Sequence, residues 1–391
     1  MLGFKHNSER TILEEQEKLQ KMIPINMPQI DEKEIEMVIE VLKSGVLTAH
    51  LGNGPMVKRF ESEFARFVEA KHAVAVNNGT AALHLALLAT GTKSGDEVIL
   101  PSFTFTGTAE AVALIGAKPV FADIVPQSYN INPEKIEEAI TEKTRAIMAV
   151  DLYGLPANMK TVNEIARKRD LIVVEDAAQA HGAMYKGKPP GHFADVACWS
   201  FYASKNMTTG EGGMVTTNND ETAEKLRCIR SHGEKEAYKS SMIGHNYRMP
   251  EIEAAIGCAQ LVKLPGFLEK RRRNTEVLTK NLSEMDGLQL PSEPQDHKHS
   301  WYLFTVRLRN TDATVRNKLV DKLQKRGVGA TVYYRTPIHL MPYYHQFGKL
   351  HLPETEKAAQ QVFSLPAHPG VTLREINYIA SSVKKELLEM M

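Results

Sequence analysis

The sequence predicts a wound α/β domain followed by a smaller α+β domain. Short runs rich in valine and isoleucine lack the polar alternation of half-exposed strands, which indicates a mainly parallel sheet buried on both faces. These runs alternate with helical patterns, as they do in wound α/β folds. After about residue 250 the alternation stops and a long helical pattern begins. The chain therefore divides into two unequal domains.

The first domain is expected to contain six strands with helices between several of them. The expected strands are 72–78, 97–102, 118–124, 145–154, 170–177 and 195–203. The expected helices are 80–90, 106–116 and 160–170.

The second domain begins with a long helical pattern over 250–285, and Pro265 with Gly266 predicts a kink within it. The segments WYLFTVRL, RNKLVDKLQKRG and VGATVYY then form a short α+β unit. We expect a helical extension over 1–23, a large domain over 24–255 and a small C-terminal domain over 256–391.

Composition excludes several classes of protein. The 391 residues carry 48 Lys and Arg against 47 Asp and Glu, so no overall charge attracts nucleic acid or an anionic membrane. No apolar run approaches the ~20 residues of a membrane span. The cysteines Cys198, Cys228 and Cys258 form no Cys-x-x-Cys pair, which indicates neither a disulfide framework nor a zinc site. These features favour a cytoplasmic protein.

Lys205 is the first candidate for chemistry, in DVACWSFYASKNMTTGEGGMVTT. It follows a buried strand and precedes a glycine-rich stretch, whereas most surface lysines lie on polar helix faces. A lysine amine becomes a good nucleophile toward a carbonyl when burial or nearby cations lower its pKa. The alternative is an ordinary solvated lysine in a loop.

Asp176, in LIVVEDAAQAHG, is expected at the carboxyl end of a central strand, where open α/β sheets bind ligands. A buried carboxylate there needs a cationic partner. The protonated pyridine nitrogen of pyridoxal 5'-phosphate (PLP) is one such partner. A helix cap and a Mg²⁺ ligand are the alternatives, although no Walker sequence accompanies Asp176.

Gly79 and Thr80, after Asn78, open the helix expected over 80–90. The glycine lets the backbone approach a ligand closely, and the free N–H groups of a first helical turn suit a phosphate. Ser200 could add a hydroxyl donor. Simple helix capping by Asn or Thr is the alternative and the more frequent explanation.

Seven segments combine along the chain: NNGTAALHLALLA, GDEVILPSFTFTGTAEAV, DLYGLPANM, VVEDAAQAHGAMYKGK, CWSFYASKNMTTGEGGMVTT, RSHG and GHNYRMPEIEAAIGCAQL. In these segments the chain resembles the DegT/DnrJ/StrS family of sugar aminotransferases. The stretch from VVEDAAQ to SKNMTTGEGG is very specific. The resemblance implies a fold type I PLP enzyme whose large α/β domain holds a mainly parallel mixed sheet flanked by helices. It also implies a homodimer with each active site at the subunit interface.

The resemblance also implies roles for residues around the cofactor. Lys205 matches the lysine that holds PLP as a Schiff base, and Asp176 matches the partner of the pyridine nitrogen. Gln179 matches the residue beside the ring hydroxyl, and Phe105 matches the aromatic that stacks on the ring. Gly79, Thr80 and Ser200 match phosphate contacts.

Three further residues match positions toward the substrate. Asn246 and Arg248, in GHNYRM, match residues lent by the neighbouring subunit, to the cofactor phosphate and to an anionic substrate group. His339 matches a histidine near the substrate mouth, with a structural loop histidine as the alternative. Asp151 departs from the family, because many members carry His there, on what we expect to be the substrate side.

The implied reaction moves an amino group from glutamate or glutamine to a keto group of a nucleotide-linked sugar, for amino-sugar or surface polysaccharide biosynthesis. The alternatives are a keto-inositol or another cyclic ketone as acceptor, an aromatizing synthase, and a non-catalytic regulator on the same fold. An intact set of Lys205, Asp176 and Gln179 argues against the regulator.

Overall fold

The computed structural model of the chain describes residues 22–390. The helix expected in the N-terminal extension falls on residues 1–21, outside the described residues. No helix in the described part is both long enough and apolar enough to span a membrane.

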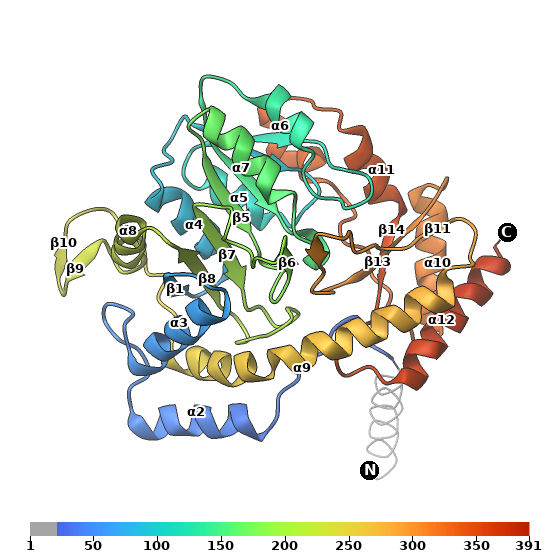
Figure 1. Cartoon of the computed structure of the whole chain (residues 1–391), viewed down its shortest axis with the longest axis horizontal. Coiled ribbons are helices and arrows are strands. Elements are labelled where there is room, and N and C mark those ends of the chain that lie inside the picture. The colour runs from blue at the N-terminus through green and yellow to red at the C-terminus, as the bar shows by residue number, and fades with distance from the viewer. Residues whose placement is uncertain (1–21, 391) are drawn as a thin grey trace, which may run out of the picture.

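A seven-stranded mixed sheet forms the centre of the large domain (Figure 1). Its strands in spatial order are β1 (His72–Val76), β8 (Gly213–Thr217), β7 (Val196–Ser200), β5 (Ile172–Asp176), β4 (Thr144–Val150), β2 (Glu97–Pro101) and β3 (Lys118–Ala122). Only β8 runs antiparallel to its neighbours β1 and β7, and the other pairings are parallel. The predicted mainly parallel α/β sheet is confirmed.

Helices cover both faces of this sheet. They are α3 (Pro55–Phe67), α4 (Gly79–Ala89), α5 (Gly107–Ala113), α6 (Pro133–Ala139), α7 (Met159–Lys168) and α8 (Asp220–Arg230). Helix α2 (Glu32–Ser44) packs instead on the long helix that follows them, where its Glu34 pairs with Lys263. Val174 and Cys198 pack in one core with α4, α5 and α8, whereas their neighbours Val173 and Trp199 face α7 and α3. The apolar runs without polar alternation are thus explained, because each strand buries side chains on both faces.

Helix α9 (Glu251–Leu282) runs along the bottom of the molecule in Figure 1, from the large domain to the small one. Leu264 belongs to a core with α3, and Leu278 belongs to the core of the small domain. The helix runs through Pro265 without interruption, and the kink predicted there stays a prediction.

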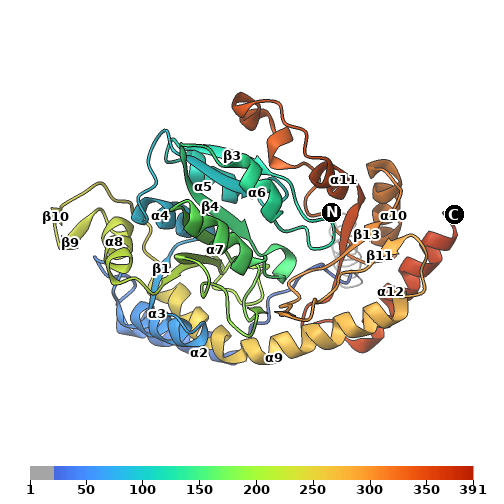
Figure 2. The ribbon, with the colours of Figure 1, turned by 45° about the horizontal axis from the view of Figure 1, so that its top comes forward.

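The small domain has a three-stranded antiparallel sheet at the side of the molecule (Figure 2). Its elements are β11 (Leu288–Gln289), β13 (Phe304–Leu308), β14 (Val362–Leu365), α10 (Ala313–Lys325), α11 (Pro353–Gln361) and α12 (Leu373–Leu388). The segment VGATVYY makes only isolated bridges, at Val328 and Thr331, and the third strand is β14. The boundaries at 23/24 and 255/256 stay predictions.

Short elements complete the chain. The two-stranded pairs are β6 (Met184–Tyr185) with β12 (His297–Lys298), and β9 (Glu234–Glu236) with β10 (Lys239–Ser240), while 3₁₀ turns occupy Leu152–Gly154, Ile338–Leu340 and Pro342–Phe347.

Candidate active site

Asp176 is the last residue of β5 and is 5% exposed. Its Oδ2 accepts a hydrogen bond from the Thr108 hydroxyl at 2.9 Å, and its Oδ1 accepts one from the backbone N–H of Ala178 at 3.2 Å. Among the described residues no cation lies within ion-pair distance of this carboxyl. Burial raises its pKa, while the two hydrogen bonds and the charge of Lys205 oppose that rise. The site therefore presents a buried carboxylate without a cationic partner among the described residues.

The N-terminus of α4 lies against the end of β7. Asn78 caps the helix by accepting from the N–H of Ala81 at 2.8 Å, which leaves the N–H groups of Gly79 and Thr80 without an intrahelical acceptor. A Cβ on Gly79 would lie 2.8 Å from the Cβ of Ser200. Glycine is thus required for this close approach, and it joins the helix terminus to the Ser200 hydroxyl.

Phe105 lies between β2 and α5 and is 54% exposed, although a phenylalanine is usually buried. A Cβ on Gly107 would lie 2.7 Å from the Thr80 hydroxyl and 3.1 Å from the Phe105 ring. The aromatic ring and the start of α4 are therefore neighbours. The open ring face provides a surface on which a planar group can stack.

Gln179 lies three residues beyond Asp176 and is 4% exposed. Its Oε1 accepts from the backbone N–H of Tyr153 at 2.7 Å, and its Nε2 donates to the Tyr334 hydroxyl at 3.2 Å. These bonds fix the orientation of the amide beside the same strand end.

Lys205 follows β7 and is partly buried. Its Nζ lies 4.8 Å from the centroid of the Tyr302 ring, and no carboxylate among residues 22–390 pairs with it. The Lys205 amine lies near enough to Asp176 for its charge to act on that carboxyl, and it has no ion-pair partner among the described residues.

These residues fit PLP on features of the protein alone. A buried unpaired carboxylate suits the pyridinium, the first turn of α4 with Ser200 suits the phosphate, and the unpaired amine of Lys205 suits the aldehyde. The predicted residues Gly79, Thr80, Phe105, Asp176 and Ser200 gather at the carboxyl ends of β5 and β7, on the face that α4 and α5 cover. Gln179 and Lys205 lie on the segments that follow these two strands.

Asn246 and Arg248 lie on an extended segment after the β9–β10 pair. Asn246 is exposed, and Arg248 donates to the Ser231 hydroxyl at 3.0 Å. The carbonyl of Tyr247 accepts from the N–H of Asn77 at 3.0 Å, so this segment is tied to the turn before α4. Within one chain the two side chains make no contact with Lys205 or Asp176.

His339 and Asp151 are both buried. His339 is 3% exposed, with its Nδ1 bonded to the Ser102 hydroxyl at 2.7 Å and its Nε2 at 3.3 Å from Glu356. Asp151 is fully buried and accepts from the N–H of Ala157 at 2.9 Å. Burial raises the pKa of Asp151 well above its ordinary value, and the nearby Glu175 carboxyl raises it further. Asp151 therefore has no surface with which to contact a substrate directly.

The sequence did not identify Thr108, Tyr302 or Tyr334 as neighbours of the site. Thr108 could have been found from its place in the first turn of the helix expected over 106–116. Tyr302 and Tyr334 come from the small domain, and no local signal marks them.

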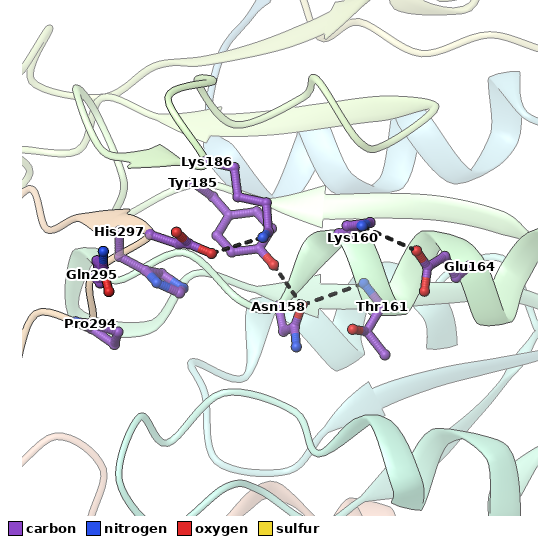
Figure 3. A pocket seen from close by; sticks show the side chains of 10 residues that line it. Asn158, Lys160, Thr161, Glu164, Tyr185, Lys186, Pro294, Gln295 and His297 are labelled. Carbon is purple, nitrogen blue, oxygen red and sulfur yellow. Dashed lines mark hydrogen bonds and ion pairs between the residues drawn. The ribbon is translucent and has the colours of Figure 1, made fainter.

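A separate pocket of about 530 Å³ lies beside the N-terminus of α7 (Figure 3). Figure 3 shows its charges paired with one another, as Lys186 with Asp296 at 2.8 Å and Lys160 with Glu164 at 3.8 Å. None of the predicted site residues lines this pocket. We therefore expect the reaction to take place at the carboxyl ends of β5 and β7.

Comparison with known proteins gives a family and individual relatives. The model of the "DegT/DnrJ/EryC1/StrS aminotransferase family" matches residues 28–384. The "Pleiotropic regulatory protein" of Geobacillus stearothermophilus is 39% identical, over 92% of this chain and 98% of that protein. The "GDP-perosamine synthase" of Caulobacter vibrioides is 37% identical, over 94% of this chain and 98% of that protein.

Among solved structures, the chain is similar to Helicobacter pylori PseC, described as an aminotransferase involved in the biosynthesis of pseudoaminic acid. The two share 32% identity and a TM-score of 0.89, over 94% of this chain and all of that one.

Proposed function

Because this chain belongs to the DegT/DnrJ/EryC1/StrS aminotransferase family, and is thus a PLP-dependent aminotransferase, we propose that its acceptor is a nucleotide-linked keto sugar. The amino group comes from glutamate or glutamine. The name of the Caulobacter relative, a GDP-perosamine synthase, supports a nucleotide sugar as acceptor.

One observation carries the chemical part of the proposal: Asp176 is buried without a cation, close to the unpaired amine of Lys205. When bound, PLP supplies an electron sink that stabilises negative charge on the α-carbon of the donor. Asp176 would hold the proton on the pyridine nitrogen, Gln179 would lie beside the ring hydroxyl, and Phe105 would stack on the ring. Gly79, Thr80 and Ser200 would hold the phosphate.

Lys205 would attach the cofactor and, once displaced, would move the proton at the α-carbon of the donor as general base and general acid. Both half-reactions would use the same lysine, so ping-pong kinetics are expected.

We also propose a homodimer in which Asn246 contacts the cofactor phosphate and Arg248 an anionic substrate group of the neighbouring site. The exposure of Asn246 supports this arrangement. His339 is proposed near the substrate mouth, where its bonds to Ser102 and Glu356 suggest support for the loop rather than contact with substrate. The buried free thiols Cys198, Cys228 and Cys258 support a cytoplasmic location.

The test is an assay of the purified protein with glutamate and a panel of nucleotide-linked keto sugars. Wild type should be yellow, lose that colour when glutamate is added, and aminate at least one sugar. Lys205→Ala should fold but lose turnover and the colour. Lys186→Ala is the matched control, since Lys186 pairs with Asp296 far from Asp176 and should leave both unchanged. Normal turnover of Lys205→Ala without added amine would remove Lys205 from the mechanism.

A regulatory role is the second candidate, which the name of the Geobacillus relative favours. A colourless wild-type protein that fails to bind PLP would support it. If wild type turns over, Asp176→Asn should abolish that turnover, because an amide cannot hold the pyridinium proton. Near-normal turnover of Asp176→Asn would remove Asp176 from the mechanism.

A further inference from the structure

The Lys205 amine lies against an aromatic ring from the other domain. Tyr302 precedes β13 and is 6% exposed, and its ring centroid is 4.8 Å from the Lys205 Nζ. This distance is within the range of a cation–π interaction between the lysine amine and the ring.

A hydrogen bond fixes this ring against the lysine. The Tyr302 hydroxyl lies 2.9 Å from the hydroxyl of Ser204, the residue directly before Lys205. The N–H of Lys205 donates to the carbonyl of Tyr202 at 2.9 Å. The turn that carries the lysine and the ring beneath its amine are therefore held as one unit.

The backbone at Tyr302 is held as firmly. Trp301 has a φ of 54°, an uncommon conformation for a bulky side chain. The guanidinium of Arg271, on α9, donates to the carbonyls of Trp301 and Tyr302 at 3.2 and 3.1 Å. Arg271 is 2% exposed, and no carboxylate among the described residues pairs with it.

The same segment is tied to the strand ends of the large domain. The N–H of Ser300 donates to the carbonyl of Gly154 at 2.9 Å, and its hydroxyl donates to the carbonyl of Gln179 at 3.0 Å. The buried guanidinium of Arg271 and the hydrogen bonds of Ser300 thus keep Tyr302 in one position relative to Lys205.

We propose that Tyr302 is a positioning residue for Lys205: its ring face holds the amine whenever the amine is not bonded to the cofactor, and Ser204 fixes the ring. This proposal rests on the role of Lys205 proposed above. With the amine held in place, capture of the cofactor aldehyde needs no search, and the lysine that has taken a proton from the donor stays close to return it.

The test compares PLP dissociation constants in four proteins: wild type, Tyr302→Leu, Lys205→Ala and the double variant. The ring contact exists only while the amine is free, so its loss should tighten PLP binding roughly 5- to 30-fold when Lys205 is present. In the Lys205→Ala background, where PLP binds without the amine, the same change should alter the constant less than about twofold. Equal changes in both backgrounds would mean that Tyr302 is merely structural and would overturn the proposal, as would weaker binding, or no change, when Lys205 is present.

Tyr185→Leu is the matched control. Tyr185 is also 6% exposed, its hydroxyl donates to Asn158 at 2.8 Å, and the Nζ of Lys186 lies 5.7 Å from its ring (Figure 3). It should leave the PLP dissociation constant unchanged in both backgrounds.

A second measurement serves if Tyr302→Leu does not fold. Tyr302→Phe keeps the ring and loses the bond to Ser204, and Ser204→Ala loses the same bond from the other side. Each should lower kcat a few-fold with little change in the KM of the donor, and the combined variant should lose no more than either alone. Additive losses, or none, would contradict the proposal. Because the first test measures cofactor binding, it can fail while the assay with sugars succeeds, and the two proposals are separable.

Discussion

At the residue scale, His181 is a buried base without a close hydrogen-bond partner. Among the described residues, neither ring nitrogen has a hydrogen-bond partner with good geometry. The ring packs among Phe64, Trp199 and Phe201. Burial lowers its pKa to about 3, and the charges of Lys205 and Arg271 contribute. The folded chain therefore keeps His181 neutral, while the unfolded chain takes up a proton below about pH 6.5.

This difference in pKa predicts a pH-dependent stability. Between pH 6.5 and 3 a proton binds His181 in the unfolded chain but not in the folded chain. The free energy of unfolding is therefore highest above pH 6.5 and decreases as the pH falls toward 3. His181→Leu removes that loss. Its free energy of unfolding relative to wild type should rise by about 1 kcal/mol per pH unit below 6.5. Denaturant titrations at pH 8 and pH 5.5 check this, with the exposed His192→Leu as control. A constant difference between wild type and His181→Leu would refute the assignment.

The limits of sequence reasoning are also clearest for single residues. Lys205 and Asp176 could be predicted because each lies beside its own strand, and that position is a local property of the chain. The contact of Lys205 with Tyr302 could not, since it depends on how the small domain packs. Asp151 was expected on the substrate side, yet its carboxyl is fully buried, where it accepts a hydrogen bond from the N–H of Ala157 in the turn after β4.

At the scale of elements, the joint between α4 and β7 gives the second prediction. A Cβ on Gly79 would lie 2.8 Å from the Ser200 Cβ and 3.2 Å from its hydroxyl. Gly79→Ala should therefore push the helix terminus away from Ser200, destabilise the fold by about 1–3 kcal/mol and weaken PLP binding.

Equilibrium binding of PLP and thermal unfolding measure the two effects of Gly79→Ala. Gly266→Ala is the control, because Gly266 is an exposed helical glycine in α9 and a Cβ there would meet no atom within 4 Å. The control should bind PLP normally. Unchanged PLP affinity in Gly79→Ala would exclude this joint as a phosphate site.

Helices and strands of the large domain could be predicted well, because each carries its own apolar pattern. The strand expected over 72–78 is β1, and the helix expected over 80–90 is α4. In the small domain, VGATVYY has the composition of a strand but makes only isolated bridges. The strand that pairs with β13 is β14. Which of two segments pairs with a given strand depends on the packing of the whole domain, and the apolar pattern of each segment does not reveal it.

At the scale of the whole molecule, the proposed dimer predicts complementation between inactive subunits. Lys205→Ala and Arg248→Ala homodimers should each be nearly inactive. If Arg248 acts in the site of the neighbouring subunit, a mixed dimer has one site with both lesions and one with neither. Random pairing makes half of the dimers mixed, so refolding an equal mixture should restore about a quarter of wild-type activity.

The control mixture pairs Lys205→Ala with Asp176→Ala. Both residues belong to the site of their own chain, so every site in a mixed dimer carries one lesion and no activity should return. If the first mixture also stays inactive although mixed dimers are present, Arg248 acts within its own subunit.

Helix α9 has a thermodynamic consequence for the molecule. It contributes Leu264 to one hydrophobic core and Leu278 to the other, and its Arg271 holds the segment of Tyr302 between them. Loss of packing in either core would expose one flank of the same helix and weaken the other core. We therefore expect the two domains to unfold together, as a single cooperative unit.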